Sequence, residues 1–199
     1  PRAPKVLPDE PQVQALADLL NGSERVALFV GRGCAGAHAE LITLAEALKS
    51  PIVHALGGKE HVEYDNPYDV GMTGFIGFSS GYKAMHSCDT LLMLGTDFPY
   101  KQFMPSHVKI AQVDIRAENL GRRARLQLGV VGDVKETLKL LVPKLKQRTS
   151  QAFLDEARKD YEKARKDLDM LARPGEHKII HPQYLASVLS EKAEPDAIF

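Results

Sequence analysis

The feature that most constrains the fold of this chain is a regular alternation between short apolar runs and segments whose apolar residues recur every three or four positions. Near-continuous apolar runs are typical of a parallel sheet covered by helices on both sides, rather than of an antiparallel sheet with one wet face. We therefore predict an α/β fold, a three-layer, doubly wound, Rossmann-like parallel sheet of six strands in the order 3-2-1-4-5-6. The strands are predicted at residues 25–30, 52–56, 70–74, 90–94, 108–115 and 126–131.

Segments with helical periodicity fill most of the chain between these strands. Asp133, followed three residues later by Glu136, predicts a capping box, and the helix that it opens is expected to continue to Leu145 with a kink at Pro143. Residues 57–67 have no such periodicity and are expected to form a long loop. Further helices in this part of the chain are predicted at 10–21, 41–48 and 79–87.

The character of the sequence changes near residue 150. Residues 1–150 are predicted to form the α/β domain, and residues 151–199 to form C-terminal linker helices, the first of them long and amphipathic. The last residues, 197–199, are apolar and are expected to begin a strand. Because a strand needs sheet partners, we interpret 151–199 as a connector that leads into a truncated further domain.

The charge balance and the cysteine count exclude several classes of function. The chain has 26 basic and 26 acidic residues, so no net field attracts a nucleic acid. Cys34 and Cys88 have no Cys-x-x-Cys or His-rich spacing, which leaves a zinc site and a disulfide framework without support. No apolar run approaches the roughly 20 residues of a membrane-spanning helix, and the N-terminus does not resemble a secretion signal. A reduced, cytoplasmic setting fits best.

The most informative local motif is a glycine loop directly after the first predicted strand. Gly31, Gly33 and Gly36 have the Gly-x-Gly-x-x-Gly spacing that lets backbone N–H groups approach a phosphate. A dinucleotide fold of the NAD type also needs an acidic residue about 20 positions on, and residues 56–58 after the second strand contain none. A free-standing NAD-binding module is therefore disfavoured, while a turn needed only for packing is an alternative. Cys34 is either a low-pKa thiol or a small residue chosen for fit.

Residues suited to a ligand also follow three other predicted strands. Residues 71–77 contain three glycines and a threonine, and residues 95–100 carry Phe98 and Tyr100 on a loop stiffened by a proline. Asp114 ends the fifth strand, where its carboxylate can accept hydrogen bonds from a ribose or cap the next turn. The aromatic residues have core packing as their alternative. Since four strand ends carry such residues, we predict an extended ligand site at the carboxyl edge of the sheet.

A group of polar residues in the expected loop has a second interpretation. The residue types found in metal or acid-base sites occur here at His61, Glu63, Tyr64 and Asp65. They follow one another along a polar segment, so we favour a solvated or interdomain loop. We predict neither a metal ligand nor a catalytic residue in this chain.

Five segments, spread over nearly the whole chain, carry a family resemblance. They are GRGCAGAHAEL (31–41), PIVHALGGKEHVEYDNPYDVGMTGFIGFSSGY (51–82), TLLMLGTDFPY (90–100), VDI (113–115) and VGDVKETL (131–138). Together they resemble the central FAD-binding domain of thiamine-diphosphate-dependent pyruvate oxidases and quinone-linked pyruvate dehydrogenases. The resemblance is most specific at residues 52–82.

The resemblance implies a three-domain subunit, usually in a homotetramer, with FAD on the central domain and thiamine diphosphate with Mg²⁺ between the outer domains. It implies that the full-length enzyme oxidatively decarboxylates pyruvate to acetate and CO2 and passes electrons through FAD to a quinone such as ubiquinone. By resemblance, the FAD-binding residues are Gly31, Gly33, Cys34, Thr73, Gly74, Phe75, Ile76, Thr96, Asp97, Phe98, Pro99, Tyr100, Asp114, Ile115, Asp133 and Val134.

The same resemblance implies that the fragment alone is inactive. The thiamine-activating Glu of the family belongs to its N-terminal domain, and the Gly-Asp-Gly metal motif to its C-terminal domain. A C-terminal tail, also absent here, would give the full-length enzyme peripheral contact with the inner face of the cell membrane. Two alternatives remain open: an acetohydroxyacid synthase-type central domain with structural FAD, and a ligand-free structural spacer domain.

Overall fold

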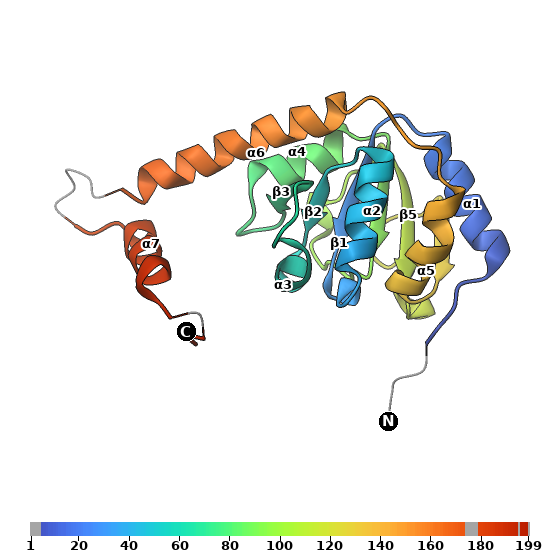
Figure 1. The fold of residues 1–199 in the computed structure, drawn as a ribbon, viewed down its shortest axis with the longest axis horizontal. Coiled ribbons are helices and arrows are strands. Elements are labelled where there is room, and N and C mark those ends of the chain that lie inside the picture. The colour runs from blue at the N-terminus through green and yellow to red at the C-terminus, as the bar shows by residue number, and fades with distance from the viewer. Residues whose placement is uncertain (1–4, 174–178, 195, 199) are drawn as a thin grey trace. The chain divides into compact units, whose positions relative to one another are not determined.

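A six-stranded parallel sheet forms the centre of the first of two compact units, Pro1–Tyr161 and Glu162–Phe199 (Figure 1). The computed structural model describes residues 5–173, 179–194 and 196–198. All neighbouring strands run parallel, and their order, β3-β2-β1-β4-β5-β6, confirms the predicted order. The strands are β1 (Val26–Val30), β2 (Ile52–His54), β3 (Asp69–Met72), β4 (Thr90–Leu94), β5 (Lys109–Asp114) and β6 (Leu128–Val131).

Helices cover both faces of this sheet because its central strands are apolar on both sides. In β1, Val26, Leu28 and Val30 join one core cluster and Ala27 and Phe29 join the other, and all five are fully buried. The predicted three-layer α/β fold is thus confirmed. The first cluster is completed by α1 (Glu10–Asn21), α2 (His38–Leu48) and α5 (Val134–Leu141), and the second by α4 (Ser79–Ser87) and the first turns of α6 (Ala152–Leu171).

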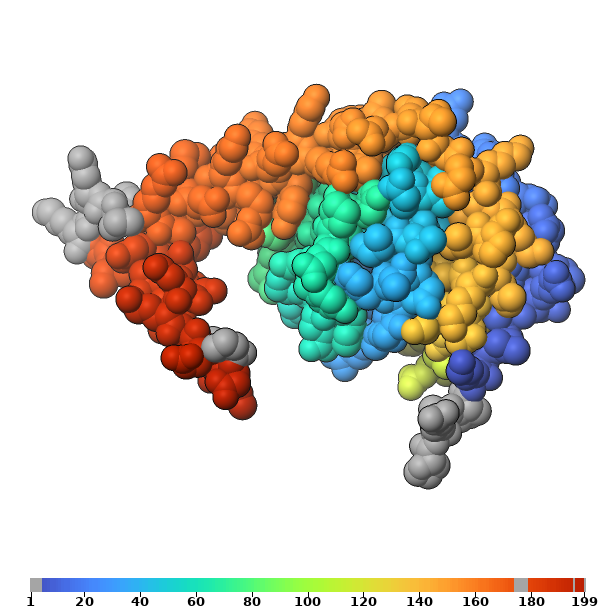
Figure 2. Space-filling model, in the orientation of Figure 1, coloured from blue at the N-terminus to red at the C-terminus, as the bar shows by residue number. Residues whose placement is uncertain are grey.

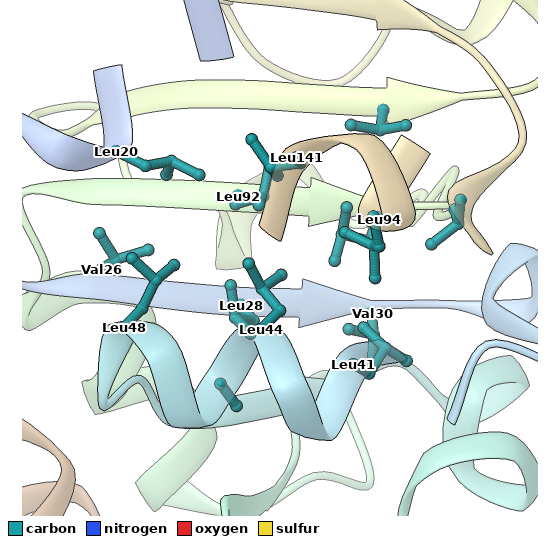
Figure 3. Close-up of a cluster of buried hydrophobic side chains, with 14 of the residues drawn as sticks. Leu20, Val26, Leu28, Val30, Leu41, Leu44, Leu48, Leu92, Leu94 and Leu141 are labelled. Carbon is teal, nitrogen blue, oxygen red and sulfur yellow. The ribbon is translucent and has the colours of Figure 1, made fainter. Parts of the chain in front are cut away.

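The leucines of α2 show how helical periodicity builds one of these layers. Leu41, Leu44 and Leu48 lie on one side of the helix, are at most 1% exposed, and face the apolar residues of β1 (Figure 3). Figure 2 shows α2 and α5 side by side, closing this face over the strands. Burying a leucine side chain stabilises the fold by roughly 1.5–3 kcal/mol, so this row of leucines fixes the helix on the sheet.

The segment predicted as a loop at 57–67 instead contains two short helical pieces. A 3-10 turn at Leu56–Gly58 leads into α3 (Lys59–Val62), and β2 ends at His54, two residues before its predicted end. Val62 is 1% exposed and packs into the core. One buried side chain is enough to hold such a turn, and four residues are too few to show a periodicity.

The helix after β6 also ends earlier than predicted. α5 stops at Leu141, and a 3-10 helix, Val142–Lys144, follows it. Pro143 therefore ends the helix and does not kink it, because proline has no N–H to donate to the preceding turn. Leu145 lies beyond the helix but is still buried in the core.

The predicted capping box at the start of α5 is half formed. Asp133 is the N-cap, and its Oδ1 accepts a hydrogen bond from the Glu136 N–H at 3.1 Å. The reciprocal bond is absent, because the Asp133 N–H donates to the Val6 carbonyl at 2.8 Å. The Glu136 carboxylate pairs instead with Lys5 at 2.8 Å and Lys139 at 3.1 Å.

The second unit consists of the end of α6 and of α7 (Pro182–Lys192). α7 begins at a proline, and the His181 ring accepts a hydrogen bond from the Gln183 N–H at 3.3 Å, so helices form where the sequence predicts them. Ala197 and Ile198 lie outside any strand, and Phe199 lies outside the described residues. Among the helices described, none has the length and apolar character needed to cross a membrane. That residues 151–199 lead into a truncated further domain stays a prediction.

Candidate functional site

The loops after β1, β2, β3 and β4 enclose a mostly apolar hollow of about 420 Å³ at the carboxyl edge of the sheet. We term it the apolar hollow. Its walls are glycines and apolar or aromatic side chains, with Thr73 as a buried polar group. Its lining consists of Gly31, Arg32, Ala55, Leu56, Gly57, Met72, Thr73, Gly74, Phe75, Ile76, Gly95, Thr96, Asp97, Phe98, Pro99 and Tyr100.

A second, polar hollow of about 500 Å³ adjoins the first and is formed by the loops after β1, β4, β5 and β6. The two hollows share Arg32, Gly95 and Asp97, so they form one groove along the edge of the sheet. The carboxyl edge is where the sequence predicts a ligand site, as expected for a doubly wound sheet. The polar hollow is lined by Arg32, Gly33, Ala35, Gly95, Asp97, Asp114, Ile115, Arg116, Asn119, Asp133 and Val134.

All but one of the predicted FAD-binding residues line one of these two hollows; the exception is Cys34. Its side chain is fully buried, and its Sγ donates to the Leu94 carbonyl at 3.3 Å. Burial raises the pKa of the Cys34 thiol to about 12. The low-pKa alternative for Cys34 is therefore wrong, and the residue is a small side chain that fits beneath the loop.

The glycine loop is shaped by close contact with the loop after β4. A Cβ on Gly33 would lie 2.6 Å from the Gly95 Cα, and one on Gly31 would lie 2.6 Å from the Thr96 Cβ. The Gly31 N–H donates to the carbonyl of Leu94, the last residue of β4, at 3.0 Å, and the Gly33 N–H donates to the Gly95 carbonyl at 2.9 Å. The Cys34 N–H is also paired within the backbone. The packing alternative explains these two glycines, and their N–H groups are not free for a phosphate.

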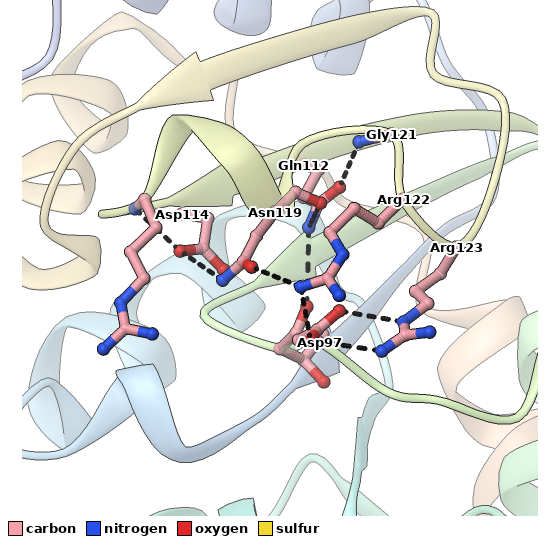
Figure 4. Close-up of polar contacts among 9 residues, drawn as sticks. Asp97, Gln112, Asp114, Asn119, Gly121, Arg122 and Arg123 are labelled. Atoms are coloured by element: carbon pink, nitrogen blue, oxygen red, sulfur yellow. Dashed lines mark hydrogen bonds and ion pairs between the residues drawn. The ribbon is translucent and has the colours of Figure 1, made fainter.

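The Asp97 carboxylate is held by two arginines from the loop after β5 (Figure 4). Arg123 Nε lies 2.8 Å from Asp97 Oδ1, and Arg122 Nη1 lies 3.3 Å from Asp97 Oδ2. Arg123 also donates through Nη2 to Oδ2 at 3.2 Å, so its contact is bidentate. The negative charge of Asp97 is therefore compensated inside the protein.

Gln112, on β5, was not predicted as a site residue. Its side chain joins the loop after β4 to the loop after β5. It is 2% exposed, and its Nε2 donates to the carbonyls of Thr96 at 3.4 Å and Asn119 at 3.3 Å. Its Oε1 accepts a hydrogen bond from the Gly121 N–H at 3.1 Å (Figure 4). A glutamine between apolar residues in the middle of a predicted strand is the sequence signal that would have found it.

Asp114 and Asp133 both have capping roles in the structure. Asp114 Oδ1 accepts hydrogen bonds from the Arg116 N–H at 2.9 Å and from Asn119 Nδ2 at 3.2 Å. Asp133 caps α5 through the Glu136 N–H. The cap role considered for Asp114 is confirmed, and its contact with a ribose stays a prediction.

The aromatic residues of the apolar hollow divide into a buried floor and an exposed rim. Phe98 is 5% exposed and packs edge-on against Phe29, with ring centroids 5.1 Å apart. Phe75 and Ile76 are 69% and 71% exposed, and the Phe75 ring contacts Tyr100 at 4.8 Å. The packing alternative therefore holds for Phe98, whereas the rim presents apolar surface that nothing in the described chain covers.

The polar residues at 61–65 do not converge on one point. The Glu63 carboxylate pairs with Lys59, and the Tyr64 ring stacks on His38 with centroids 4.2 Å apart. Within residues 5–173, 179–194 and 196–198, no group of three or more His, Cys, Asp or Glu side chains is placed to hold a metal ion.

His54, at the end of β2, and Asp69, at the start of the neighbouring β3, form a buried polar pair. The His54 Nε2 lies 3.4 Å from Asp69 Oδ1 and 3.5 Å from Glu63 Oε2, and neither His54 Nε2 nor Asp69 Oδ1 makes a hydrogen bond. Burial raises the pKa of Asp69 to about 7, and burial also lowers the pKa of His54. Both groups therefore favour their neutral forms.

We expect Asp69→Asn to reduce the loss of stability that the protein shows at higher pH. An acid whose pKa is raised in the folded state costs no stability below its unfolded pKa of 3.8. The cost grows as pH rises from about 4 to about 7, because the unfolded state ionises first, and it is constant above that range. At pH 8 the variant should be more stable than the wild type by about 3 kcal/mol, and near pH 4 the two should be alike. His54 acts in the opposite sense, because protonation destabilises it as pH falls.

Urea unfolding across this pH range measures the difference. Asp65→Asn, at an exposed position, is the matched control because it removes the same charge. Parallel stability curves for wild type and Asp69→Asn would contradict the assignment.

A third hollow, of about 580 Å³, lies at the opposite edge, where the strands begin, and has a structural explanation. Its arginines are engaged: Arg148 donates to the carbonyls of Leu20, Ser23 and Glu24, and the Arg25 guanidinium lies 4.4 Å from the centre of the Phe153 ring. The arginines at the amino edge therefore hold neighbouring segments of the chain together, and the candidate ligand site is the groove at the carboxyl edge.

Fold and groove together define a class, the Rossmann-like α/β domain with a ligand-sized groove at the carboxyl edge of its sheet. Within that class, this chain belongs to the thiamine pyrophosphate enzyme central-domain family, whose model matches residues 13–141. The predicted membership of a thiamine-diphosphate enzyme is thus confirmed at the level of the family.

The relatives with similar sequences are longer proteins. An uncharacterized 42.6 kDa protein of Pseudomonas amyloderamosa is 68% identical over 85% of this chain and 43% of its own length. The acetolactate synthase large subunit of Corynebacterium glutamicum is 28% identical over 98% of this chain and 33% of its own length. The chain therefore spans less than half the length of either relative.

A solved structure supports the fold assignment. The benzoylformate decarboxylase of Polynucleobacter necessarius matches with a TM-score of 0.64 over 75% of this chain and 29% of that chain, at 23% identity. At this level of identity the match concerns the fold alone.

Proposed function

We propose that this chain is the FAD-binding central domain of a thiamine-diphosphate-dependent enzyme. The observation that supports this most directly is the division of one groove into an apolar half with aromatic walls and a polar half lined by acidic, amide and guanidinium groups. A dinucleotide with a flat, apolar ring at one end and a ribose-rich, charged end at the other has the matching chemistry. When bound, FAD supplies a reversible acceptor for two electrons.

A buried hydroxyl in the apolar hollow also supports a ligand there. Thr73 is 3% exposed and lines the hollow, and its Oγ1 makes no hydrogen bond. Leaving such a group unpaired costs about 1–3 kcal/mol, which a polar atom of a bound ring would recover. The spacer-domain alternative gives no account of this unpaired group.

The experiment that tests FAD binding is a titration of the purified 199-residue chain with FAD, followed by quenching of flavin fluorescence. We expect saturable binding with one site per chain, and a spectrum with the two visible flavin bands after removal of free ligand. A chain that shows no saturable quenching would contradict the proposal, and Thr73→Val should weaken binding if the hydroxyl contacts the ring.

The reaction of the enzyme that contains such a domain has two candidates. The acetolactate synthase relative favours an acetohydroxyacid synthase in which FAD is structural. The resemblance at 52–82 supports the other candidate, a pyruvate:quinone oxidoreductase. Anaerobic addition of pyruvate to the enzyme separates them: bleaching of the flavin bands followed by reduction of ubiquinone indicates the oxidoreductase, and formation of acetolactate with unchanged bands indicates the synthase.

A further inference from the structure

Arg32 lies where the groove changes from apolar to polar. It lines the apolar hollow, the polar hollow and another, more open hollow of about 670 Å³ that Lys59 and Tyr64 also line. Its guanidinium makes no ion pair and no hydrogen bond within the part of the chain that the structure describes, and the residue is exposed. A cation thus stands uncompensated at the junction of the two hollows.

Two of the acidic groups around this junction are already engaged within the protein. Arg122 and Arg123 neutralise Asp97, and Asp114 turns one carboxylate oxygen toward its own loop. The Arg116 guanidinium also makes no ion pair among the described residues, but Arg116 lines the polar hollow and not the apolar hollow. Arg32 is therefore the cationic side chain that both hollows share among the described residues.

Four backbone N–H groups of the glycine loop are already used within the protein. The N–H groups of Gly31, Gly33, Cys34 and Ala35 donate to carbonyls of Leu94, Gly95 and the loop itself. The loop belongs to a 3-10 turn of three residues, Arg32–Cys34, and not to the start of a long helix. The Arg32 guanidinium is therefore the charged group that this loop offers to an anion.

We propose that Arg32 binds the diphosphate of the dinucleotide, and so fixes the ring end in the apolar hollow and the adenosine end in the polar hollow. This inference rests on the proposed function. A guanidinium suits the task because its planar set of donors matches phosphate oxygens in pairs. The competing explanation is a solvated arginine that covers Gly57, whose position for a Cβ lies 3.7 Å from Arg32 Nε.

The test compares FAD with riboflavin, which has the same ring but no phosphate, by fluorescence titration of the 199-residue chain. Arg32→Ala should weaken FAD binding tenfold or more, because a charge-assisted bond is lost, and should change riboflavin binding less than twofold. Arg32→Lys should recover part of the affinity. Arg125→Ala is the matched control, since it removes the same charge from an exposed position outside the hollows.

Each outcome decides one of the two claims. FAD binding that changes less than twofold in Arg32→Ala, or that falls by the same factor as riboflavin binding, would overturn the role of Arg32. If the wild-type chain binds no FAD, the proposed function fails, and a titration with inorganic pyrophosphate then decides the anion site. Pyrophosphate binding that Arg32→Ala abolishes would keep that site, and no pyrophosphate binding to the wild type would remove it.

Discussion

Replacing Gly95 with alanine is expected to lower the free energy of unfolding by about 3 kcal/mol or more. Gly95 has a φ of +56°, a left-handed conformation that costs an L-residue roughly 1–2 kcal/mol. A Cβ at this position would also lie 2.5 Å from the Gly33 Cα, which is backbone and cannot rotate away. Urea unfolding measures the loss, and FAD titration of the variant should show that the displaced loop no longer forms the groove.

Gly36→Ala is the control for the Gly95 prediction. Gly36 has a φ of +74°, but no atom lies within 4 Å of the position that its Cβ would occupy. The control therefore measures the conformational cost alone, about 1 kcal/mol. A Gly95 variant no less stable than the Gly36 variant would show that the contact between the two loops is not tight.

The prediction from sequence succeeded where a residue's environment depends on its near neighbours. β1 is apolar at every residue and β4 at every residue after Thr90, and the leucines of α2 recur at helical spacing, so the layers and the strand order followed from general rules of parallel sheets. The convergence of the four loops on one edge followed from the same rules. Fold and location of the groove were therefore both accessible.

The details of the groove were less accessible because they depend on partners distant in sequence. The pairing of Asp97 with Arg122 and Arg123 joins loops 25 and 26 residues apart in the chain, and nothing local in the sequence announces it. Arg32 was missed because an arginine in a loop is normally a solvated residue. Its proposed role depends on a guanidinium without an ion pair, which can be recognised only once the surrounding loops are placed in the structure.

The glycine loop shows a different limit. Its spacing predicts a phosphate cradle, but the same spacing is produced by the need to pack one loop closely against another. The structure assigns Gly31 and Gly33 to packing, since their N–H groups are paired with the end of β4 and the loop that follows it. A spacing motif therefore locates a tight turn reliably, whereas the ligand has to be argued from the groups that the turn leaves unpaired.

The apolar hollow allows stability and binding to be separated by two aromatic substitutions. Phe98→Ala removes a ring that is 5% exposed and packed on Phe29, so we expect a loss of about 3–4 kcal/mol in the free energy of unfolding. Phe75→Ala removes a ring that is 69% exposed, so its cost in stability should stay below about 1 kcal/mol. Thermal unfolding of the two variants measures the contrast.

For FAD binding, in contrast to stability, we expect Phe75 to matter more than its small contribution to the fold suggests. If the exposed Phe75 ring packs on a flat ligand ring, Phe75→Ala should weaken FAD binding about tenfold while the protein remains folded. Phe75→Leu, which keeps apolar surface without the aromatic face, tests whether ring stacking is needed. Unchanged FAD affinity in Phe75→Ala would move the ligand ring away from the rim, and a strongly destabilised Phe75→Ala would instead make this residue part of the structural floor with Phe98.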